Sequence, residues 1–218
     1  MNGRISRAEA ASWILTLGQF GVAGAIAVFG PTHPLPMHFG LDGQVDRWGG
    51  RTEMAAVAFV LAVISALAMV FGRLPESDAH LLRGRRYSRQ AVVAVLSLIA
   101  LLEACLTWGW PNEPGPRFGM MAISAIVAFV GALLGKTSPN AMIGVRTPWT
   151  YGSRLAWEKA NRLAGRLFFW GGLTGGLAAP FAPQPEGLKA VTFGALAVAA
   201  ISVFESWRVW RSDPDRVV

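Results

Sequence analysis

The stretch that decides the fold is residues 54–72, MAAVAFVLAVISALAMVFG, which contains neither a charged residue nor a proline. An α-helix needs about 20 apolar residues to cross the roughly 30 Å hydrocarbon core of a bilayer. A helix also satisfies its own backbone hydrogen bonds, which lipid does not. The stretch therefore predicts a membrane-spanning helix.

Five further apolar runs lie on either side of it, at about residues 10–29, 90–110, 118–135, 167–183 and 188–207. The run at 167–183 is short and rich in glycine, and the run at 10–29 is longer than an ordinary signal-peptide core, so it is expected to be retained. The composition agrees, since 53% of the 218 residues are hydrophobic and only 15% are charged, against roughly 25% charged residues in soluble domains.

We expect an all-α, polytopic membrane protein with six transmembrane helices, folded as a single membrane domain over residues 1–218. Residues 10–72 hold the first two spans with an outer loop at 30–53. Residues 90–135 hold spans three and four, residues 136–166 form a loop, and residues 167–208 hold spans five and six.

The basic residues are distributed unevenly between the connecting segments. With the N-terminus inside the cell, 16 of the 20 Lys and Arg residues fall in inner loops and tails, and four fall in outer ones. Because positively charged segments stay in the cytoplasm, both termini and the loop at 136–166 are expected there. The net charge of +7 is then a topology signal rather than a sign of direct nucleic-acid binding. The single cysteine, Cys105, excludes an intramolecular disulfide.

The outer loop, PTHPLPMHFGLDGQVDRWGGRTE at residues 31–53, is rich in proline and glycine. Its side chains His38, Asp42 and Asp46 are of the types that bind divalent metals. Their spacing matches no metal signature, and neither a metal nor another cofactor is expected. The favoured interpretation is that both aspartates accept hydrogen bonds from turn amides and that His38 packs against the helices.

The inner loop, GKTSPNAMIGVRTPWTYGSRLAWEKANRLAGR at residues 135–166, predicts a helix of its own. Ser153 is a candidate N-cap for a helix over 154–165. Glu158 lies four residues from both Arg154 and Arg162, a spacing that allows ion pairs on an exposed face. The opposite stripe consists of Trp157, Ala160 and Ala164. We predict an amphipathic helix that lies at the membrane interface between spans four and five, with Trp157 as its anchor.

The segment just before that helix has two equally supported interpretations. Pro148 fixes an extended turn, and Arg146 is suited to bind a phosphate, a carboxylate or a helix C-terminus. The segment is either a docking surface for a protein partner or a structural hinge that seats the helix.

The stretch GVRTPWTYGSRLAWEKANRLAG resembles the signature of the SdpI family, named for a bacterial immunity protein against a secreted killing peptide. The matching positions are Asn140, Gly144, Arg146, Thr147, Pro148, Trp149, Thr150, Trp157, Asn161, Arg162 and Gly165. The outer-loop piece PMHFGLDGQVDRWGG resembles a short domain of unknown function that often precedes this signature. It matches at Pro36, His38, Phe39, Gly43, Asp46 and Trp48.

The resemblance implies a multi-pass protein of the bacterial inner membrane. The sequence shows no zinc-protease motif, no nucleophile elbow and no plausible cysteine dyad, so we expect that the protein is not an enzyme. The resemblance also implies protection against a secreted toxic peptide and recruitment of a small cytoplasmic DNA-binding repressor to the membrane. The residues expected to contact the peptide are His38, Asp42, Gly43, Asp46 and Trp48. The residues expected to form the cytoplasmic docking site are Asn140, Gly144, Arg146, Thr147, Pro148, Trp149, Trp157, Asn161 and Arg162.

Glu103 is the one acidic residue well inside an apolar run. An ionised side chain there costs on the order of 2.5–3.5 kcal/mol on insertion scales, so it is expected to face the bundle or a cavity. It is either a functional proton- or cation-binding group, or a neutral acid hydrogen-bonded to Gln19, Thr107 or the backbone. Two alternative functions follow, a small proton-linked transporter or flippase that uses Glu103 and a metal-dependent membrane enzyme that uses His38.

Glycines recur in three of the runs at spacings that let helices approach closely. They are Gly18, Gly21, Gly24, Gly131, Gly135, Gly171, Gly172, Gly175 and Gly176. Packing within this chain is the favoured interpretation, and a dimer interface is the alternative.

Overall fold

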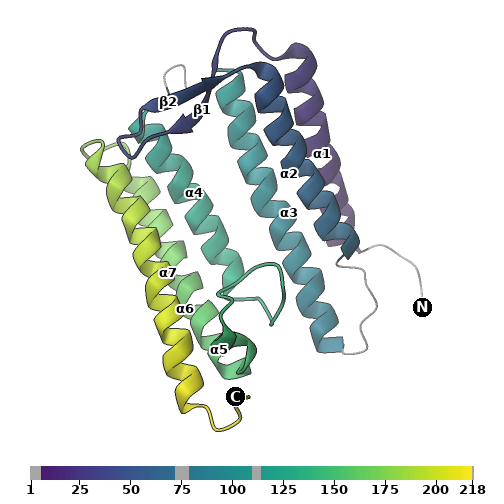
Figure 1. Cartoon of the computed structure of the whole chain (residues 1–218), viewed down its shortest axis with the longest axis vertical. Helices are drawn as coiled ribbons and strands as arrows, with labels where there is room; N and C mark the ends of the chain where they lie inside the picture. Colours follow the sequence, from purple (N-terminus) through teal and green to yellow (C-terminus); the bar gives the residue numbers. More distant parts are fainter. Residues whose placement is uncertain (1–5, 72–78, 110–113, 218) are drawn as a thin grey trace. The chain divides into compact units, whose positions relative to one another are not determined.

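The structure is a computed structural model that describes residues 6–71, 79–109 and 114–217. Within these ranges the chain forms helices and one two-stranded sheet (Figure 1). The elements in chain order are α1 (Arg7–Phe29), β1 (Leu35–Phe39), β2 (Val45–Gly49), α2 (Arg51–Phe71), α3 (Ala79–Thr107), α4 (Pro116–Leu134), α5 (Pro148–Tyr151), α6 (Arg154–Ala178) and α7 (Glu186–Ser212).

Among the described residues, five helical segments are long and apolar enough to cross a membrane. They are Arg7–Phe29, Arg51–Val70, Gly84–Thr107, Pro116–Leu134 and Glu186–Ser212. Large apolar side chains such as Leu17, Val60 and Phe204 are exposed on these helices, as expected of surfaces that face lipid. The predicted class, a helical multi-pass membrane protein, is confirmed in outline, and five of the six predicted runs lie in such helices.

The predicted break between an interfacial helix and the fifth span is wrong. The structure has one continuous helix, α6, where the sequence predicted a helix over 154–165 and a span over 167–183. The junction residues Arg166 and Leu167 are good helix formers, so nothing there ends the helix. The apolar residues 167–178 give about 18 Å of helix, which is shorter than the roughly 30 Å bilayer core. A sixth span therefore stays a prediction.

The predicted outer loop contains an antiparallel β-hairpin, which the sequence pattern did not predict. Strands β1 and β2 pair with Leu35 opposite Gly49 and Phe39 opposite Val45, and a bulge interrupts the pairing near His38. Gly43 closes the turn with a φ of 73°, a conformation that glycine adopts without strain. The strands are short and contain Pro36, which weakens the alternation from which a strand is recognised.

The chain divides into two compact units, of which the first contains residues 1–75 and 89–115. In this unit α1 packs against α2 around an apolar core that includes Ala23, Ile26, Met54 and Ala58. Leu35 of the hairpin is fully buried in the same core. The hairpin is thus seated on the ends of α1 and α2.

A buried glutamine links three helices of the first unit. Gln19 of α1 donates from Nε2 to the Ser97 hydroxyl of α3 at 2.7 Å, and its Oε1 accepts from the Ser65 hydroxyl of α2 at 2.7 Å. The same Nε2 lies 3.4 Å from the carbonyl oxygen of Val93. Because lipid supplies no hydrogen bonds, a polar group that is satisfied between helices holds them together.

Helix α3 begins earlier than the predicted run at 90–110 and includes residues that were predicted to lie in a loop. One of them, Arg89, is only 3% exposed and forms an ion pair with Glu9 of α1 at 3.3 Å. Arg89, which was expected in a loop, therefore forms an ion pair within the first unit.

The second unit contains residues 76–88 and 116–218. In it α4, α6 and α7 lie side by side (Figure 1). A Cβ atom on Gly172 of α6 would stand 2.6 Å from the Ser124 carbonyl oxygen of α4, and one on Gly165 would stand 2.9 Å from the Gly135 nitrogen. The backbones of α4 and α6 therefore touch, and the predicted packing within the chain is confirmed for Gly172. A Cβ atom would meet nothing within 4 Å at Gly18, Gly21, Gly24, Gly135 and Gly171.

Candidate functional site

The segment between α4 and α6, residues 135–153, here called the signature loop, is folded around buried polar side chains. Asn140 organises its first half. The Asn140 Oδ1 accepts from the backbone N–H groups of Met142 and Ile143, each at 2.8 Å. Its Nδ2 donates to the carbonyl oxygens of Ser138 and Ile143, at 2.8 and 2.9 Å. The amide uses both its donor and its acceptor ends, so its role in the structure is to shape the loop.

Two side chains in the first two turns of α6 form hydrogen bonds with the signature loop. Trp157 is fully buried and donates from Nε1 to the Thr137 carbonyl oxygen at 3.0 Å. Asn161, one turn later and 1% exposed, accepts the Val145 N–H at 2.7 Å and donates to the Trp157 carbonyl oxygen at 3.0 Å. The predicted apolar stripe faces protein rather than lipid, so the prediction that Trp157 anchors the helix at the membrane interface is wrong.

Gly144 fits into the small space above these two side chains. Its φ is +134°, which residues with a Cβ atom rarely adopt. A Cβ atom there would stand 2.8 Å from Asn161 Oδ1 and 3.0 Å from the Trp157 ring. The signature position is glycine for both backbone and packing reasons.

The second half of the loop forms the short helix α5, which is attached to α7. Thr147 and Thr150 make a reciprocal capping box, with Pro148 in the first turn. The Thr147 hydroxyl also lies 3.0 Å from the Ser206 hydroxyl of α7. Because the Ser206 hydroxyl donates to the Val203 carbonyl oxygen at 2.6 Å, Thr147 is the donor to Ser206.

The end of the chain folds back onto the junction of α5 and α6. Ser153, which caps α6 as predicted, also donates its hydroxyl to the buried Asp213 carboxylate. This hydrogen bond, with a second from the Asp215 N–H and the charge of Arg216, holds the pKa of Asp213 below its ordinary value. The Val217 N–H donates to the Gly152 carbonyl oxygen at 2.8 Å. Figure 1 shows α5 and the C-terminus at the same end of this unit.

Other signature side chains stay at the surface. Arg146 is exposed and donates from Nη1 to the Ala141 carbonyl oxygen within the loop. Pro148 is exposed, Trp149 is half-buried, and Tyr151 is 57% exposed. This exposed edge is the part of the signature that a partner can reach.

Beneath the loop lies a cavity of about 430 Å³. Its walls are residues 142–147 of the loop together with side chains of α4, α6 and α7, among them Leu134, Phe168 and Val203. The lining is mostly apolar, apart from Arg146 and Thr147 at the loop side. The loop therefore covers a mostly apolar space between α4, α6 and α7.

Residues 136–205 match the SdpI/YfhL protein family. The matched range covers the signature loop from Lys136, α5, α6 and α7 as far as Glu205, and it confirms the suspected resemblance for this part of the chain. No curated protein and no solved structure matched the chain. The match includes every predicted docking residue, and it does not reach the hairpin or Glu103.

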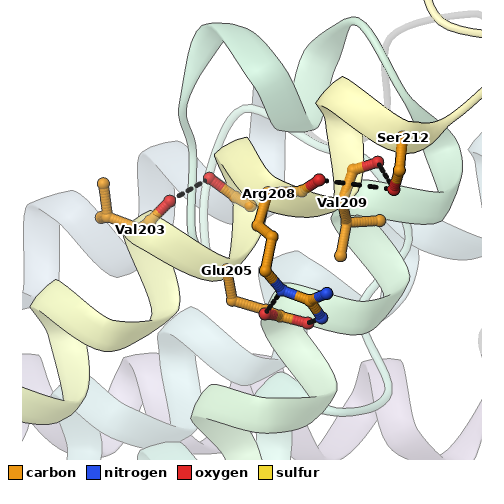
Figure 2. A network of polar contacts seen from close by, with 6 residues as sticks. Val203, Glu205, Arg208, Val209 and Ser212 are labelled. Carbon is orange, nitrogen blue, oxygen red and sulfur yellow. Dashed lines mark hydrogen bonds and ion pairs between the residues drawn. The ribbon is translucent and has the colours of Figure 1, made fainter.

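The last turns of α7 carry a polar network at the end of the SdpI segment (Figure 2). Arg208 donates to Glu205 in a bidentate ion pair, with both nitrogen–oxygen distances at 2.7 Å. Ser212 donates to the carbonyl oxygens of Val209 and Arg208, at 3.0 and 3.4 Å. This network lies at the end of α7 that is next to Ser206 and Asp213, the residues to which Thr147 and Ser153 are hydrogen-bonded.

The hairpin lies outside the SdpI match, and its three candidate ligands behave differently. Asp42 accepts the Gln44 N–H at 3.0 Å, as predicted for a turn. Asp46 instead lies 2.6 Å from His38 Nδ1, and the His38 side chain is 66% exposed, so the predictions that Asp46 binds a turn amide and that His38 packs against the helices are wrong. Within the described ranges no three His, Cys, Asp or Glu side chains gather so that they could hold a metal.

Glu103 is half-buried in α3, and its Oε2 is buried without a hydrogen-bond partner. Neither partner suggested for it binds its carboxyl group. Gln19 is used by Ser65, Ser97 and Val93, and the Thr107 hydroxyl donates to the backbone oxygen of Glu103 at 2.8 Å. The residue therefore keeps an unused buried acceptor.

The residues that sequence reasoning missed at this site are Thr137, Ser206 and Asp213. Each of them contributes a buried polar group to the site. Each lies far along the chain from the residue that it binds. The available signal for Ser206 was its hydroxyl group, because a hydroxyl in a membrane helix needs a hydrogen-bond acceptor.

Proposed function

We propose that the chain is an integral membrane immunity and signalling protein that protects a bacterium against a secreted antimicrobial peptide. The observation that carries the proposal is the match of residues 136–205 to the SdpI/YfhL protein family. The 16 to 4 division of basic residues supports an inner-membrane location with both termini in the cytoplasm. Under this proposal the hairpin faces outward and the signature loop faces inward.

The hairpin is the proposed contact surface for the peptide. Trp48 and Leu41 are 56% and 61% exposed on it, which offers apolar surface outside the helices. The carboxylate of Asp46 is bound to His38, and Glu53 is paired with Arg47. Asp42 therefore supplies the less engaged negative charge beside that apolar surface.

The signature loop is the proposed docking site for a cytoplasmic DNA-binding repressor. Its buried half is fixed to α6 and α7, while Arg146, Trp149 and Tyr151 line its accessible edge. A peptide that binds one packing of the helices better than another would shift the population toward that packing. Any such shift in α6 or α7 would move the loop that these helices hold.

The experiment challenges sensitive bacteria that produce the chain with the secreted killing peptide of the SdpI system. Trp48→Ala and Asp42→Ala are expected to lower the inhibitory peptide concentration by about tenfold if these side chains are binding hot spots. Arg146→Ala is expected to abolish membrane recruitment of a fluorescent repressor. Lys159→Ala, an exposed basic residue outside the signature positions, is the control. Unchanged protection and recruitment in all variants at normal protein levels would refute the proposal.

A second candidate function, proton-linked transport, is favoured by one observation, the unpartnered buried oxygen of Glu103. Ionisable groups within spans commonly mark ion pathways. Purified protein in liposomes should then move protons down an imposed gradient, and Glu103→Gln should abolish that flux. A flux that survives in the Gln variant, or no flux in the unsubstituted protein, removes this candidate.

A further inference from the structure

A shallow groove between α4 and α6 carries a cluster of positive charge. It has a volume of about 360 Å³ and lies where α4 ends and α6 crosses it. Three basic side chains surround it, Lys136, Arg162 and Arg166, and none of its lining residues is acidic. The remaining wall is formed by small residues and by the aromatic rings of Phe169 and Trp170.

The three cations have no acidic partner among the described residues. The predicted pairing of Glu158 with Arg154 forms, at 3.0 Å, whereas no pairing of Glu158 with Arg162 is found among the described residues. Arg166 uses its Nε for a 3.5 Å hydrogen bond to the Arg162 carbonyl oxygen, which leaves its two terminal nitrogens available. All three side chains are exposed. A concentration of unpaired positive charge around one groove is costly unless an anion offsets it.

The groove lies where the helix changes from polar to apolar. On its N-terminal side α6 carries Arg154, Lys159, Arg162 and Arg166, and beyond Arg166 the residues to Ala178 include no charge. In a membrane helix this boundary coincides with the headgroup region. Trp170 is 60% exposed one turn beyond Arg166, in the position that amphipathic aromatic rings prefer.

The close contact of the two backbones gives the groove its floor. A Cβ atom on Gly165 would stand 3.0 Å from the Gly131 carbonyl oxygen, so no side chain separates α4 from α6 there. The basic side chains lie on one end of this seam and the aromatic rings on the other. The arrangement has one charged end and one apolar end, as a phospholipid does.

We infer that this groove binds an anionic phospholipid. Lys136, Arg162 and Arg166 hold the phosphate, for which the two guanidinium groups supply planar paired donors. The acyl chains lie over Phe169 and Trp170. This inference rests on the second unit alone and does not depend on the proposed immunity function.

The test is native mass spectrometry of the full-length protein with added lipids. The protein is expected to retain one phosphatidylglycerol in preference to phosphatidylcholine, and each Arg→Gln change, at Arg162 or Arg166, is expected to weaken retention by about fivefold. Arg162→Lys with Arg166→Lys keeps the charge and is expected to retain part of the binding. Arg211→Gln removes a cation from α7 outside the groove and is expected to have no effect.

Three results would overturn the inference. The first is equal retention of the zwitterionic lipid. The second is an equal loss in Arg211→Gln, which would mean that only bulk charge matters. The third is displacement of the lipid by millimolar inorganic phosphate, which would identify a free-anion site. Unchanged elution of each variant on size exclusion, together with an unchanged helical circular dichroism signal, shows that a loss of binding does not reflect unfolding.

Discussion

Gly144 shows how a single residue fixes the signature loop to α6. Its φ of +134° and the space left by Trp157 and Asn161 both exclude a side chain. The same contacts bury the Asn161 amide, which holds the Val145 N–H. Removal of a partner from such a buried pair costs about 1–3 kcal/mol.

Gly144→Ala is therefore expected to lower the free energy of unfolding by about 1–3 kcal/mol, through backbone strain and the contact with Asn161. Thermal unfolding in detergent measures the change. Gly135→Ala is the control, because a Cβ atom at Gly135 meets nothing within 4 Å. Equal effects of the two substitutions would contradict this account of Gly144.

The Ser153–Asp213 hydrogen bond predicts a pH dependence. Because the pKa of Asp213 is lowered in the folded state, its carboxylate stabilises the fold above the ordinary pKa, and this contribution is lost as the pH falls through the lowered value. The Tm difference between the unsubstituted protein and Asp213→Asn should be largest above about pH 5 and should shrink on acidification. A difference that is constant with pH would argue against an ionised Asp213 in the fold.

At the scale of elements, the crossing of α4 and α6 explains why glycines of one motif differ in importance. Gly172 and Gly171 are neighbours in α6, but only at Gly172 would an added Cβ atom meet the α4 backbone, at 2.8 Å from the Ala128 Cα. Lipid gives no hydrophobic drive for helix association, so close packing of the two backbones contributes much of the free energy that holds α4 and α6 together.

Gly172→Val is expected to destabilise the second unit by more than about 1–3 kcal/mol, because the added atoms meet backbone that has no room to move. Gly171→Val is the matched control on the exposed face and is expected to change stability little. Resistance of the α4–α6 segment to limited proteolysis in detergent measures the effect. Comparable losses in both variants would mean that the crossing is not where the structure places it.

The continuity of α6 also belongs to this scale. The sequence shows a charged half and an apolar half, and this contrast predicts two helices. Arginine, lysine, glutamate, leucine and alanine are all good helix formers, and the charged half buries Trp157, Ala160 and Ala164 against its neighbours in the second unit. A change in polarity marks a change of surroundings along a helix and does not by itself end the helix.

At the scale of the whole molecule, the distribution of basic residues predicts that the hairpin and the signature loop lie on opposite sides of the membrane. In a chain carrying Cys105→Ser, a Leu41→Cys change should be labelled by a membrane-impermeant maleimide on intact cells. A Tyr151→Cys change should be labelled only after permeabilisation. Both sites are exposed in the structure, so a lack of labelling reports topology rather than burial. Labelling at position 151 in intact cells would reverse the proposed orientation.

The sequence by itself determined the helical membrane class in outline, the position of five helices long and apolar enough to cross a membrane, the N-cap at Ser153 and the resemblance of residues 136–205 to the SdpI/YfhL protein family. These are local properties, since hydrophobic runs, capping residues and motif spacing are read from neighbouring positions. Only the tertiary structure decided that Trp157 is buried, that Gly172 rather than Gly171 makes contact, and that Ser206 and Asp213 hold the signature loop. The reason is that burial and hydrogen-bond partners depend on which helices pack together, and the partners here are about 60 residues apart in the chain.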